Sequence, residues 1–406
     1  MTTFDENQEA GIGVALKPWP IWPQPGEDER QLILRALDER WDGVDAPLVV
    51  EAEQAFAEYV QAGNGISVSN GTISLEIALQ AVGVSSGDEV IVPPYTFLAT
   101  ASAVVKVNAL PVFVDIDPDN WCVDPEAVLA AITPRTRAVI AVHLGGHPAD
   151  LDRLQQICRT HGLALIEDAA HAHGAVWRGR PVGTVGDFGS WSFQGSKNIS
   201  TGEGGLLTTN RDDLAAKARS LRNCGRRQDG PWYEHEELGG NHRITSFQAA
   251  LLLAGLKRLP KQIIRREESA AHLDRELATL PGLRPLARDP RVDVHAHHLY
   301  IIRYDMEATG ISRDDLVAGL NTLGVPASAG YPIPLYAQRV FREARFDRAA
   351  TGWEQSVGDV RYDQVRLPVC ERACAQAIWL HHEILLANPP EINRIVEAAA
   401  HVLGAS

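Results

Sequence analysis

Lysine is scarce in this chain. Of the 406 residues, 38 are lysine or arginine. The lysines are Lys17, Lys106, Lys197, Lys217, Lys257 and Lys261. Chemistry that depends on a primary amine therefore has few candidate side chains, and each can be weighed by its surroundings.

Cysteine is also sparse, and the cysteines are scattered along the sequence. The five cysteines are Cys122, Cys158, Cys224, Cys370 and Cys374. An odd number without the paired spacing of metal ligands argues against a disulfide framework and against a zinc site. We expect buried or idle thiols and no bound metal.

Basic residues are outnumbered, and long apolar runs are missing. The chain carries 52 acidic residues and a formal net charge of −14, which disfavours nucleic acid and anionic lipid surfaces as partners. No apolar run approaches the roughly 20 residues of a transmembrane helix. The start, MTTFDENQEAGIG, is acidic where a signal peptide is positively charged. We therefore expect a cytoplasmic protein.

Short β-rich runs alternate with helical segments from about residue 66 onward. The expected strands cover residues 89–93, 110–115, 138–144, 163–168, 189–193 and 205–209. This alternation predicts an α/β fold with a mostly parallel sheet covered by helices. Before it, residues 1–26 are rich in proline and tryptophan and look irregular, and residues 27–41 have the apolar spacing of an amphipathic helix.

The length of the chain favours two domains. A long helical segment, about residues 244–280, leaves the alternating region, and strands and helices are mixed beyond it. We assign residues 1–260 to a large domain with an N-terminal arm and helix, and residues 261–406 to a smaller C-terminal α/β domain.

Residues Ser69–Thr72 precede a helical run. Serine, asparagine and threonine favour helix caps, and Gly71 allows a ligand to approach the backbone closely. The free N–H groups of a helix N-terminus bind phosphate readily. The alternative is an ordinary capped helix.

A second segment, LIEDAAHAH, begins at Leu165 and contains Asp168 at the expected end of a strand. Ligands bind at the carboxyl ends of parallel strands. An ionised carboxylate there can hold a proton on a heteroaromatic nitrogen. The alternative is a carboxylate that pairs with a histidine or arginine inside the fold.

The third segment contains Lys197, which follows the strand GSWSF in a turn flanked by Gly195 and Gly202. A partly desolvated lysine can lose its proton and form a Schiff base, whereas the alternative role is an ammonium group that pins the loop. The other lysines resemble solvated cations.

Together the three segments offer the contacts that pyridoxal phosphate requires: a phosphate site, an acid for the pyridine nitrogen and an amine for the aldehyde. An aromatic side chain stacked on the ring would complete the site. We expect Phe97 rather than Tyr95 to stack there, although either ring can equally be ordinary core packing.

With these segments, the chain resembles the DegT/DnrJ/StrS family of aminotransferases, which are fold type I enzymes that use pyridoxal phosphate. The resemblance spans about residues 19–386. The matching stretches are SNGT (69–72), GDEVIVPPYTFLATASA (87–103), PVFVDIDPDNWCVDPE (111–126), EDAAHAHGA (167–175), GDFGSWSFQGSKNISTGEGG (186–205), NHRITSFQAALL (241–252) and GYPIPLY (330–336).

The resemblance implies a role for each matching residue. Lys197 would form the covalent link to the cofactor and shuttle the proton, and Asp168 would pair with the pyridine nitrogen. The other implied cofactor contacts are Gly71, Thr72 and Ser192 at the phosphate, Phe97 and His171 at the ring, and Asn241 reaching from a neighbouring subunit. A homodimer with shared sites, acting on a small-molecule donor and acceptor, is therefore expected.

The acceptor is suggested by position 194. Gln194 is similar to members that act on cyclitols, such as scyllo-inosose aminotransferases, and to 3-amino-5-hydroxybenzoate synthases. A glutamine donates and accepts hydrogen bonds without titrating, which suits a neutral polyol. We expect Tyr331 to line the acceptor side and suggest Arg243 for the donor carboxylate. Glutamine or glutamate as donor, and aminocyclitol or amino-sugar antibiotic assembly as pathway, are the natural expectations.

Several alternatives stay open. A keto-sugar nucleotide is a possible acceptor because the arginines of the run 222–227 can grip a diphosphate. A 3-amino-5-hydroxybenzoate synthase requires the same lysine. A dehydratase of the family would have histidine in place of Lys197, and a non-catalytic regulator that senses the cofactor or a sugar would not need an intact set of Asp168, Lys197 and Asn241.

Overall fold

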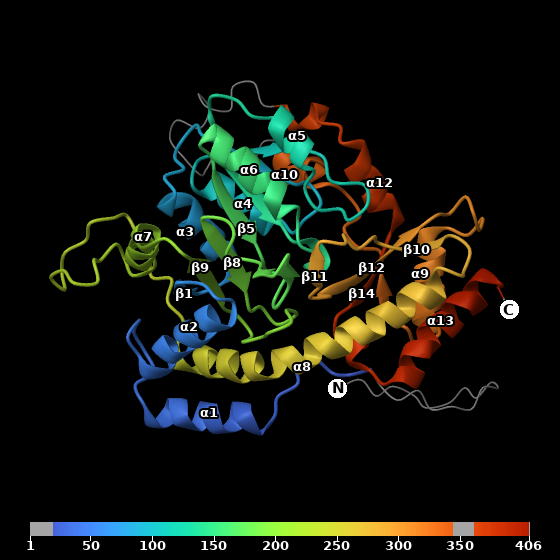
Figure 1. Cartoon of the computed structure of the whole chain (residues 1–406), viewed down its shortest axis with the longest axis horizontal. Helices are drawn as coiled ribbons and strands as arrows, with labels where there is room; N and C mark the ends of the chain where they lie inside the picture. The colour runs from blue at the N-terminus through green and yellow to red at the C-terminus, as the bar shows by residue number, and fades with distance from the viewer. Residues whose placement is uncertain (1–18, 344–360, 406) are drawn as a thin grey trace.

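The computed structural model describes residues 19–343 and 361–405. The expected irregular start up to residue 18, with Lys17, lies outside this part of the chain. The described residues form a larger α/β region and a smaller one, and a long helix runs beneath both (Figure 1).

The larger region is built on a seven-stranded sheet with the strand order β1-β9-β8-β5-β4-β2-β3. Its strands are β1 (Asn64–Val68), β2 (Glu89–Val92), β3 (Leu110–Phe113), β4 (Thr136–Val142), β5 (Ala164–Asp168), β8 (Phe188–Ser192) and β9 (Gly205–Thr209). Strands β8, β5, β4, β2 and β3 are parallel to one another, and β9 runs antiparallel to its neighbours β8 and β1. The prediction of a mostly parallel sheet is confirmed, and each of the six expected strands is present.

Both faces of this sheet are buried, as parallel sheets require. Successive residues of β2 show the alternation: Val90 and Val92 face one apolar core, and Ile91 faces another. Helices supply the other side of each core. They are α3 (Gly71–Ala81), α4 (Ala99–Lys106) and α7 (Asp212–Arg222) for the first core, and α5 (Pro125–Ala130), α6 (Leu151–His161) and α12 (Pro368–Gln376) for the second.

The smaller region contains a four-stranded antiparallel sheet with the order β10-β12-β14-β13. Its elements are β10 (Leu283–Pro285), β12 (Leu299–Tyr304), β13 (Ala327–Ser328), β14 (Ala377–His381), α9 (Arg313–Thr322) and α13 (Pro389–Leu403). A third, three-stranded sheet joins β6 (Val176–Trp177), β7 (Arg180–Pro181) and β11 (Val292–Val294). The short helix α10 (Arg339–Arg342) and the 3-10 turns η1 (Leu144–Gly146), η2 (Leu335–Ala337), η3 (Tyr362–Gln364) and η4 (Ile384–Leu386) complete the described elements.

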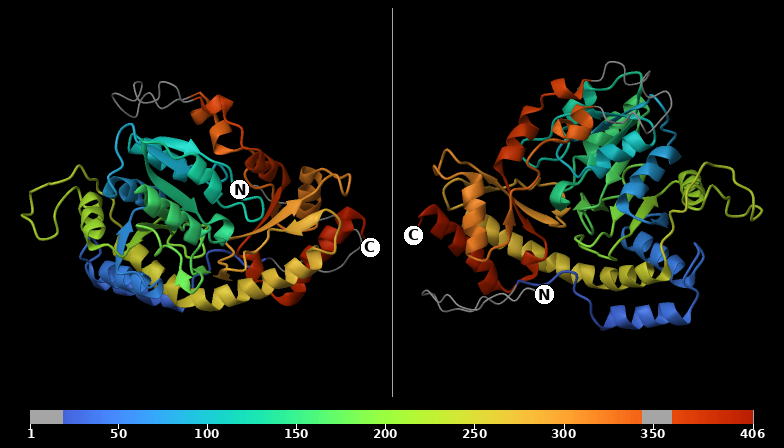
Figure 2. Two further views of the ribbon diagram at one scale, coloured as in Figure 1. Left: turned by 45° about the horizontal axis from the view of Figure 1, so that its top comes forward. Right: turned by 180° about the vertical axis from the view of Figure 1, so that it is seen from behind.

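The long helix α8 (Ser246–Leu277) spans both regions, as the two further views also show (Figure 2). It begins with a capping box between Thr245 and Gln248. Its buried side chains belong to two further apolar clusters: Leu252 and Leu259 pack in one with residues of β8 and β9, and Leu273 packs in one with residues of β12 and β14. The helices α1 (Glu27–Asp38) and α2 (Pro47–Tyr59) pack against its first half (Figure 1). The expected domain boundary falls on Pro260, inside this helix, so the division into residues 1–260 and 261–406 stays a prediction.

None of the helices in the described part of the chain combines the length and the apolar character needed to cross a lipid bilayer.

Candidate active site

The carboxyl ends of β5 and β8 and the start of α3 face one cavity of about 640 Å³. Nine side chains or backbone positions expected from the sequence line it: Gly71, Thr72, Phe97, Asp168, His171, Ser192, Gln194, Lys197 and Tyr331. The three chemical segments of the sequence therefore meet because parallel strands end at the same edge of the sheet.

The start of α3 is shaped for close contact with an anion. Asn70 caps the helix, and its side chain accepts a hydrogen bond of 2.9 Å from the Ile73 N–H group. A Cβ atom on Gly71 would lie 2.7 Å from the Cβ atom of Ser192, so only glycine fits there. The N–H groups of a first helical turn have no acceptor within the helix. An anion in the cavity can accept hydrogen bonds from them.

Asp168 ends β5 and is buried. The Thr100 hydroxyl donates to its Oδ2 atom at 2.9 Å, and the Ala170 N–H group donates to its Oδ1 atom at 3.3 Å. Burial raises the pKa of Asp168, and the hydrogen bond from Thr100 and the charge of Lys197 oppose that rise. A cationic group placed beside this carboxylate would favour its ionised form strongly.

The neighbouring carboxylate, Glu167, has a structural role instead. Its oxygens accept hydrogen bonds from the N–H groups of Gly183, Val185 and Gly186, and Oε2 lies 3.1 Å from Nε2 of His143. Burial alone would raise the pKa of Glu167, but the hydrogen bonds from His143 and the backbone outweigh burial and lower it. Of the two adjacent acids, Glu167 is therefore the one that pairs with a histidine inside the fold.

Lys197 follows β8 and lines the same cavity as Asp168. Burial lowers the pKa of its amine to about 8, although the charge of Asp168 acts in the opposite direction. About a tenth of this amine is therefore unprotonated at pH 7, far more than for an ordinary lysine, and the unprotonated amine is the nucleophilic form.

Phe97 and Tyr95 occupy different environments. The ring of Phe97 lines the cavity and is 60% exposed, whereas Tyr95 is 1% exposed. Tyr95 makes edge-to-face contacts with Trp121, Tyr331 and Trp379. Tyr95 is therefore core packing, and Phe97 is the ring that remains free to stack on a ligand.

His171 is held as a neutral ring. The Gly145 N–H group donates to its Nδ1 atom at 3.3 Å, so the proton of the neutral ring lies on Nε2. Burial lowers the pKa of His171 far below its ordinary value, and the nearby charge of Lys197 adds to this effect. Its ring centroid lies 4.2 Å from that of His298.

Other residues that line the cavity had no role assigned from the sequence. Among them are Thr100, His298, Trp379 and His381. The last three come from the smaller region, at the beginning of β12 and along β14. The paired histidines at 297–298 and 381–382, each beside an apolar strand, were the signal in the sequence that could have found two of them.

Asn241 and Arg243 are not among the residues that line this cavity. The backbone of Asn241 pairs with Asn223, and the guanidinium of Arg243 donates to the Oδ1 atom of Asn223 at 2.7 Å. The intervening residue, His242, accepts a hydrogen bond from the Ser69 N–H group at 2.8 Å. The segment therefore lies beside the start of α3, and the roles expected for Asn241 and Arg243 stay predictions.

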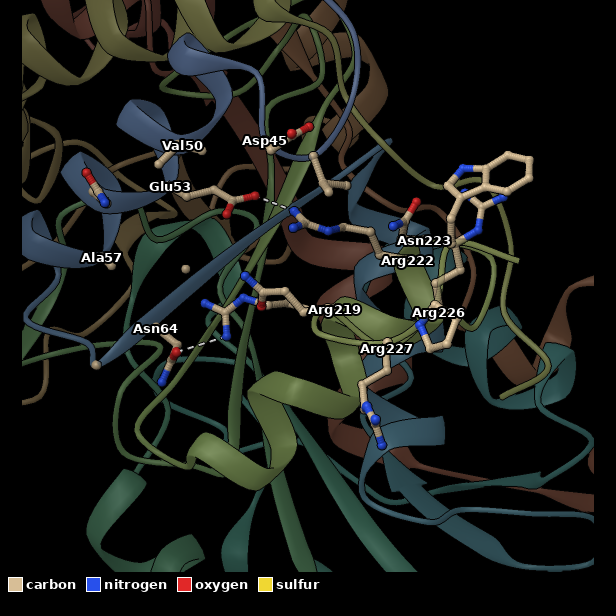
Figure 3. A pocket seen from close by; sticks show the side chains of 18 residues that line it. Asp45, Val50, Glu53, Ala57, Asn64, Arg219, Arg222, Asn223, Arg226 and Arg227 are labelled. Carbon is tan, nitrogen blue, oxygen red and sulfur yellow. Dashed lines mark hydrogen bonds and ion pairs between the residues drawn. The ribbon is translucent and has the colours of Figure 1, made fainter. Parts of the chain in front are cut away.

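The arginine run after α7 lines a separate pocket of about 820 Å³ (Figure 3). Arg219, Arg222, Arg226 and Arg227 line it, together with the acidic side chains of Asp45 and Glu53. This pocket shares no lining residue with the cavity at Lys197. Among the described residues that line the Lys197 cavity there is no arginine, and its charged side chains are Asp168, Lys197 and Glu203.

Comparison with known proteins gives three concordant matches. Residues 23–399 match the DegT/DnrJ/EryC1/StrS aminotransferase family. The L-glutamine:2-deoxy-scyllo-inosose aminotransferase of Streptoalloteichus tenebrarius is 40% identical over 97% of this chain and 96% of that protein. The L-glutamine:scyllo-inosose aminotransferase of Streptomyces griseus is 39% identical over the same shares of the two chains.

Solved structures give the same result for the fold. The crystal structure of 3-amino-5-hydroxybenzoic acid synthase superimposes with a TM-score of 0.86 at 35% identity, over 96% of this chain and 99% of that chain. The expected fold type I architecture is thereby confirmed.

Proposed function

The chain belongs to the DegT/DnrJ/EryC1/StrS aminotransferase family and is an aminotransferase, and we propose that it uses pyridoxal phosphate to transfer an amino group from glutamine to the ring ketone of a cyclitol. The observation that carries this proposal is the meeting of Lys197, Asp168 and the start of α3 at one cavity.

The cavity fits the cofactor in three ways. The tight approach of Gly71 to Ser192 leaves bare backbone N–H groups for the phosphate, with Thr72 and Ser192 beside them. The buried Asp168 carboxylate suits a protonated pyridine nitrogen, because a cation there repays the cost of its burial. The exposed face of Phe97 and the Nε2–H group of His171 are available to the ring.

Pyridoxal phosphate supplies an aldehyde that condenses with amines and a ring that withdraws electrons from the neighbouring carbon. Lys197, whose amine has a pKa of about 8, provides the nucleophile that joins this aldehyde. When it is not joined to the cofactor, the Lys197 amine would move a proton between the substrate carbon and the aldehyde carbon of the cofactor, from the donor in the first half-reaction and to the acceptor in the second. Asp168 would hold the pyridine nitrogen, and the positive charge of a protonated pyridine would in turn favour the ionised form of this carboxylate.

The acceptor side of the cavity favours a neutral polyol. Gln194, Tyr331 and His381 offer hydrogen-bonding groups there, and no arginine of this chain's described residues lines it. Burial raises the pKa of Tyr331, so its hydroxyl remains a neutral donor. Relatives that are 39–40% identical are named as glutamine-dependent aminotransferases of scyllo-inosose and its 2-deoxy analogue. We therefore propose a role in aminocyclitol antibiotic biosynthesis, in the cytoplasm.

A second candidate is the synthesis of 3-amino-5-hydroxybenzoate. The close superposition on that synthase favours it, since both reactions require an amine at the position of Lys197. A keto-sugar nucleotide is disfavoured, because the arginine run lies in a different pocket of this chain. A sensor without activity is disfavoured, because the cavity keeps both Lys197 and Asp168.

We further propose that the enzyme works as a homodimer in which Asn241 reaches the phosphate of the second copy. The loop between α7 and α8 projects from the body of the chain (Figures 1 and 2). Its side chains Trp232, Tyr233 and Leu238 are exposed, Leu238 by 97%, as expected for a surface that a second copy covers. Mixing Lys197→Ala with Asn241→Ala subunits should restore part of the activity if the sites are shared.

Borohydride reduction of the cofactor-loaded enzyme tests the proposal directly. Peptide mapping should place the reduced label on Lys197. A screen with glutamine as donor and scyllo-inosose, 2-deoxy-scyllo-inosose, aminodehydroshikimate and keto-sugar nucleotides as acceptors should show turnover with a cyclitol ketone. A label on another residue, or turnover with keto-sugar nucleotides alone, would contradict it.

A further inference from the structure

The backbone of the lysine loop is tied to distant parts of the chain. The indole Nε1–H group of Trp22 donates to the carbonyl oxygen of Lys197 at 3.0 Å. Nε2 of His382 lies 3.0 Å from the carbonyl oxygen of Ser196, the residue before the lysine. Trp22 precedes α1, and His382 directly follows β14. Two consecutive carbonyl groups at the reactive lysine are thus held by side chains from opposite ends of the sequence.

Arg266, on α8, determines which nitrogen of His382 carries the proton. Its Nη2 atom lies 3.0 Å from Nδ1 of His382. A guanidinium only donates hydrogen bonds, so Nδ1 must accept and the proton of the neutral ring must lie on Nε2. That proton points to the Ser196 carbonyl. Burial, together with the charge of Arg266, lowers the pKa of His382 far below its ordinary value, which keeps the ring neutral.

Trp22, Arg266 and His382 form one contiguous group. The ring centroids of Trp22 and His382 lie 4.5 Å apart in an edge-to-face arrangement, and the Cζ atom of Arg266 lies 5.8 Å from the centroid of the Trp22 ring. Each member therefore restrains the other two, and we refer to these three residues as the lysine-loop clamp.

The buried position of Arg266 lowers the stability of the fold. Its side chain is fully buried, its Nη1 atom has no hydrogen-bond partner among the described residues, and burial lowers its pKa to about 9. The carboxylate that acts on it electrostatically, Glu383, is partly exposed and makes no ion pair with it in the described part of the chain. A buried guanidinium without a paired carboxylate lowers stability compared with an apolar side chain of similar size. A role other than stability accounts for its presence.

We propose that Trp22 and His382, oriented by Arg266, are positioning residues that hold the backbone of Lys197 so that its amine faces Asp168 in a dry part of the cavity. This inference rests on the proposed function of Lys197. The clamp residues do not line the cavity, so they act through the lysine rather than on the substrate. When the clamp is weakened, the amine should gain access to water and be misdirected during proton transfer.

The chain offers a matched pair of variants. Trp19 and Trp22 belong to the same N-terminal segment, and each donates an indole hydrogen bond to a backbone carbonyl, Trp19 to that of Gly324 at 2.6 Å. Trp22→Phe removes the bond to Lys197 and keeps an aromatic ring, whereas Trp19→Phe removes an equivalent bond far from the lysine. We expect Trp22→Phe to lower kcat about 10- to 100-fold with little change in the donor KM, and Trp19→Phe to change kcat less than about twofold.

A second pair separates geometry from bulk at His382. A glutamine can present an amide N–H group close to the position of Nε2, and an asparagine is too short to reach the Ser196 carbonyl. We expect His382→Gln to retain kcat within about threefold, and His382→Asn to behave like Trp22→Phe.

The decisive readout does not depend on turnover. In cofactor-free protein, the acetylation rate of Lys197 can be followed by mass spectrometry across pH. The midpoint should lie near the wild-type pKa of about 8 in Trp19→Phe. It should rise toward the ordinary lysine value, by about 0.5 pH unit or more, in Trp22→Phe and His382→Asn, because hydration favours the protonated amine.

The outcomes separate the two levels of inference. If wild-type enzyme takes no borohydride label on Lys197, the proposed function itself fails. If Lys197 is labelled but Trp22→Phe matches Trp19→Phe in both kcat and acetylation midpoint, only the clamp is refuted. Equal losses of melting temperature and of activity in Trp22→Phe and Trp19→Phe would likewise assign these tryptophans a purely structural role and overturn the proposal.

Discussion

Two pockets of this chain differ in the charged side chains that line them. The pocket at Arg222 gathers four arginines (Figure 3), and neighbours such as Glu53, Asn64 and Glu236 pair with members of this group. The cavity at Lys197 is lined by a single lysine, and burial lowers the pKa of its amine. A guanidinium cannot lose its proton under ordinary conditions, whereas an ammonium can.

The difference between the two pockets indicates that the nucleophilicity of a basic side chain depends on its desolvation and not on how many cations surround it. Arg222 donates to Glu53 and to the Ser67 carbonyl, so its charge is compensated where it is buried. Lys197 has Asp168 nearby, but burial outweighs that carboxylate. Burial of the Lys197 ammonium group does not stabilise the fold. It lowers the pKa of the amine and so increases the fraction that can act as a nucleophile.

The largest effect should follow from Lys197→Ala. Without the amine, neither covalent attachment of the cofactor nor proton transfer at the substrate can occur, so transamination should fall by about four orders of magnitude or more. The cofactor should still bind through its phosphate. Lys261→Ala, on an exposed position of α8, is the control and should keep full activity. Near-normal turnover in Lys197→Ala would show that the buried Lys197 amine is not the reactive group of its cavity.

A somewhat smaller loss is expected for Asp168→Asn. The amide can still accept the hydrogen bond from Thr100, but it carries no charge to hold the pyridine nitrogen protonated. Steady-state assays should show kcat lower by about a thousandfold with the melting temperature preserved. A variant that retains more than a tenth of wild-type kcat would show that the carboxylate charge is not required.

Arg222→Met tests the other pocket by stability rather than activity. The substitution removes the partner of the buried Glu53 carboxylate, which accepts further hydrogen bonds from the N–H and hydroxyl groups of Ser67. An uncompensated buried charge should lower the free energy of unfolding by about 3 kcal/mol in chemical denaturation. The double variant Arg222→Met/Glu53→Gln should recover part of the lost stability. If Arg222→Met alone leaves the free energy of unfolding unchanged, the ion pair is hydrated.

The pH dependence of cofactor attachment should report the Lys197 amine. Because the neutral amine is the nucleophile, the attachment rate in cofactor-free enzyme should rise with pH and reach half its maximum near pH 8. The unfolded chain binds this proton up to the ordinary pKa of 10.5, so burial of the amine destabilises the fold below pH 8 and ceases to do so above 10.5. Asp168→Asn should move the midpoint downward. A midpoint near 10.5 in wild type would mean that the amine is hydrated.

The smallest effect is expected for Arg226→Gln. Arg226 lies over the ring of Trp232 at the rim of the arginine pocket, 5.4 Å from the ring centroid. Turnover of a cyclitol ketone should change less than about threefold, because that acceptor offers no anion to a guanidinium. A loss of more than about tenfold, confined to nucleotide acceptors, would connect the arginine pocket to substrate binding.

Local patterns in the sequence predicted most of the large sheet, but not β1. Apolar runs of β-branched residues, such as 89–93, identify buried parallel strands directly. Strand β1 is short, begins Asn64–Gly65, and pairs antiparallel with β9 at the edge of the sheet. Its place depends on α2, since a Cβ atom on Gly65 would lie 2.5 Å from the carbonyl oxygen of Glu53. No local pattern contains that contact.

The sequence by itself determined the chemistry of the cavity, because Gly71, Asp168 and Lys197 lie at strand ends and helix starts that one parallel sheet must bring to a common edge. Only the tertiary structure brought His298, Trp379 and His381 to the cavity and assembled the lysine-loop clamp. Those groups come from segments far from Lys197 in the sequence, the nearest of them at Arg266, and their positions are set by packing between the two sheets and α8, which no local periodicity encodes.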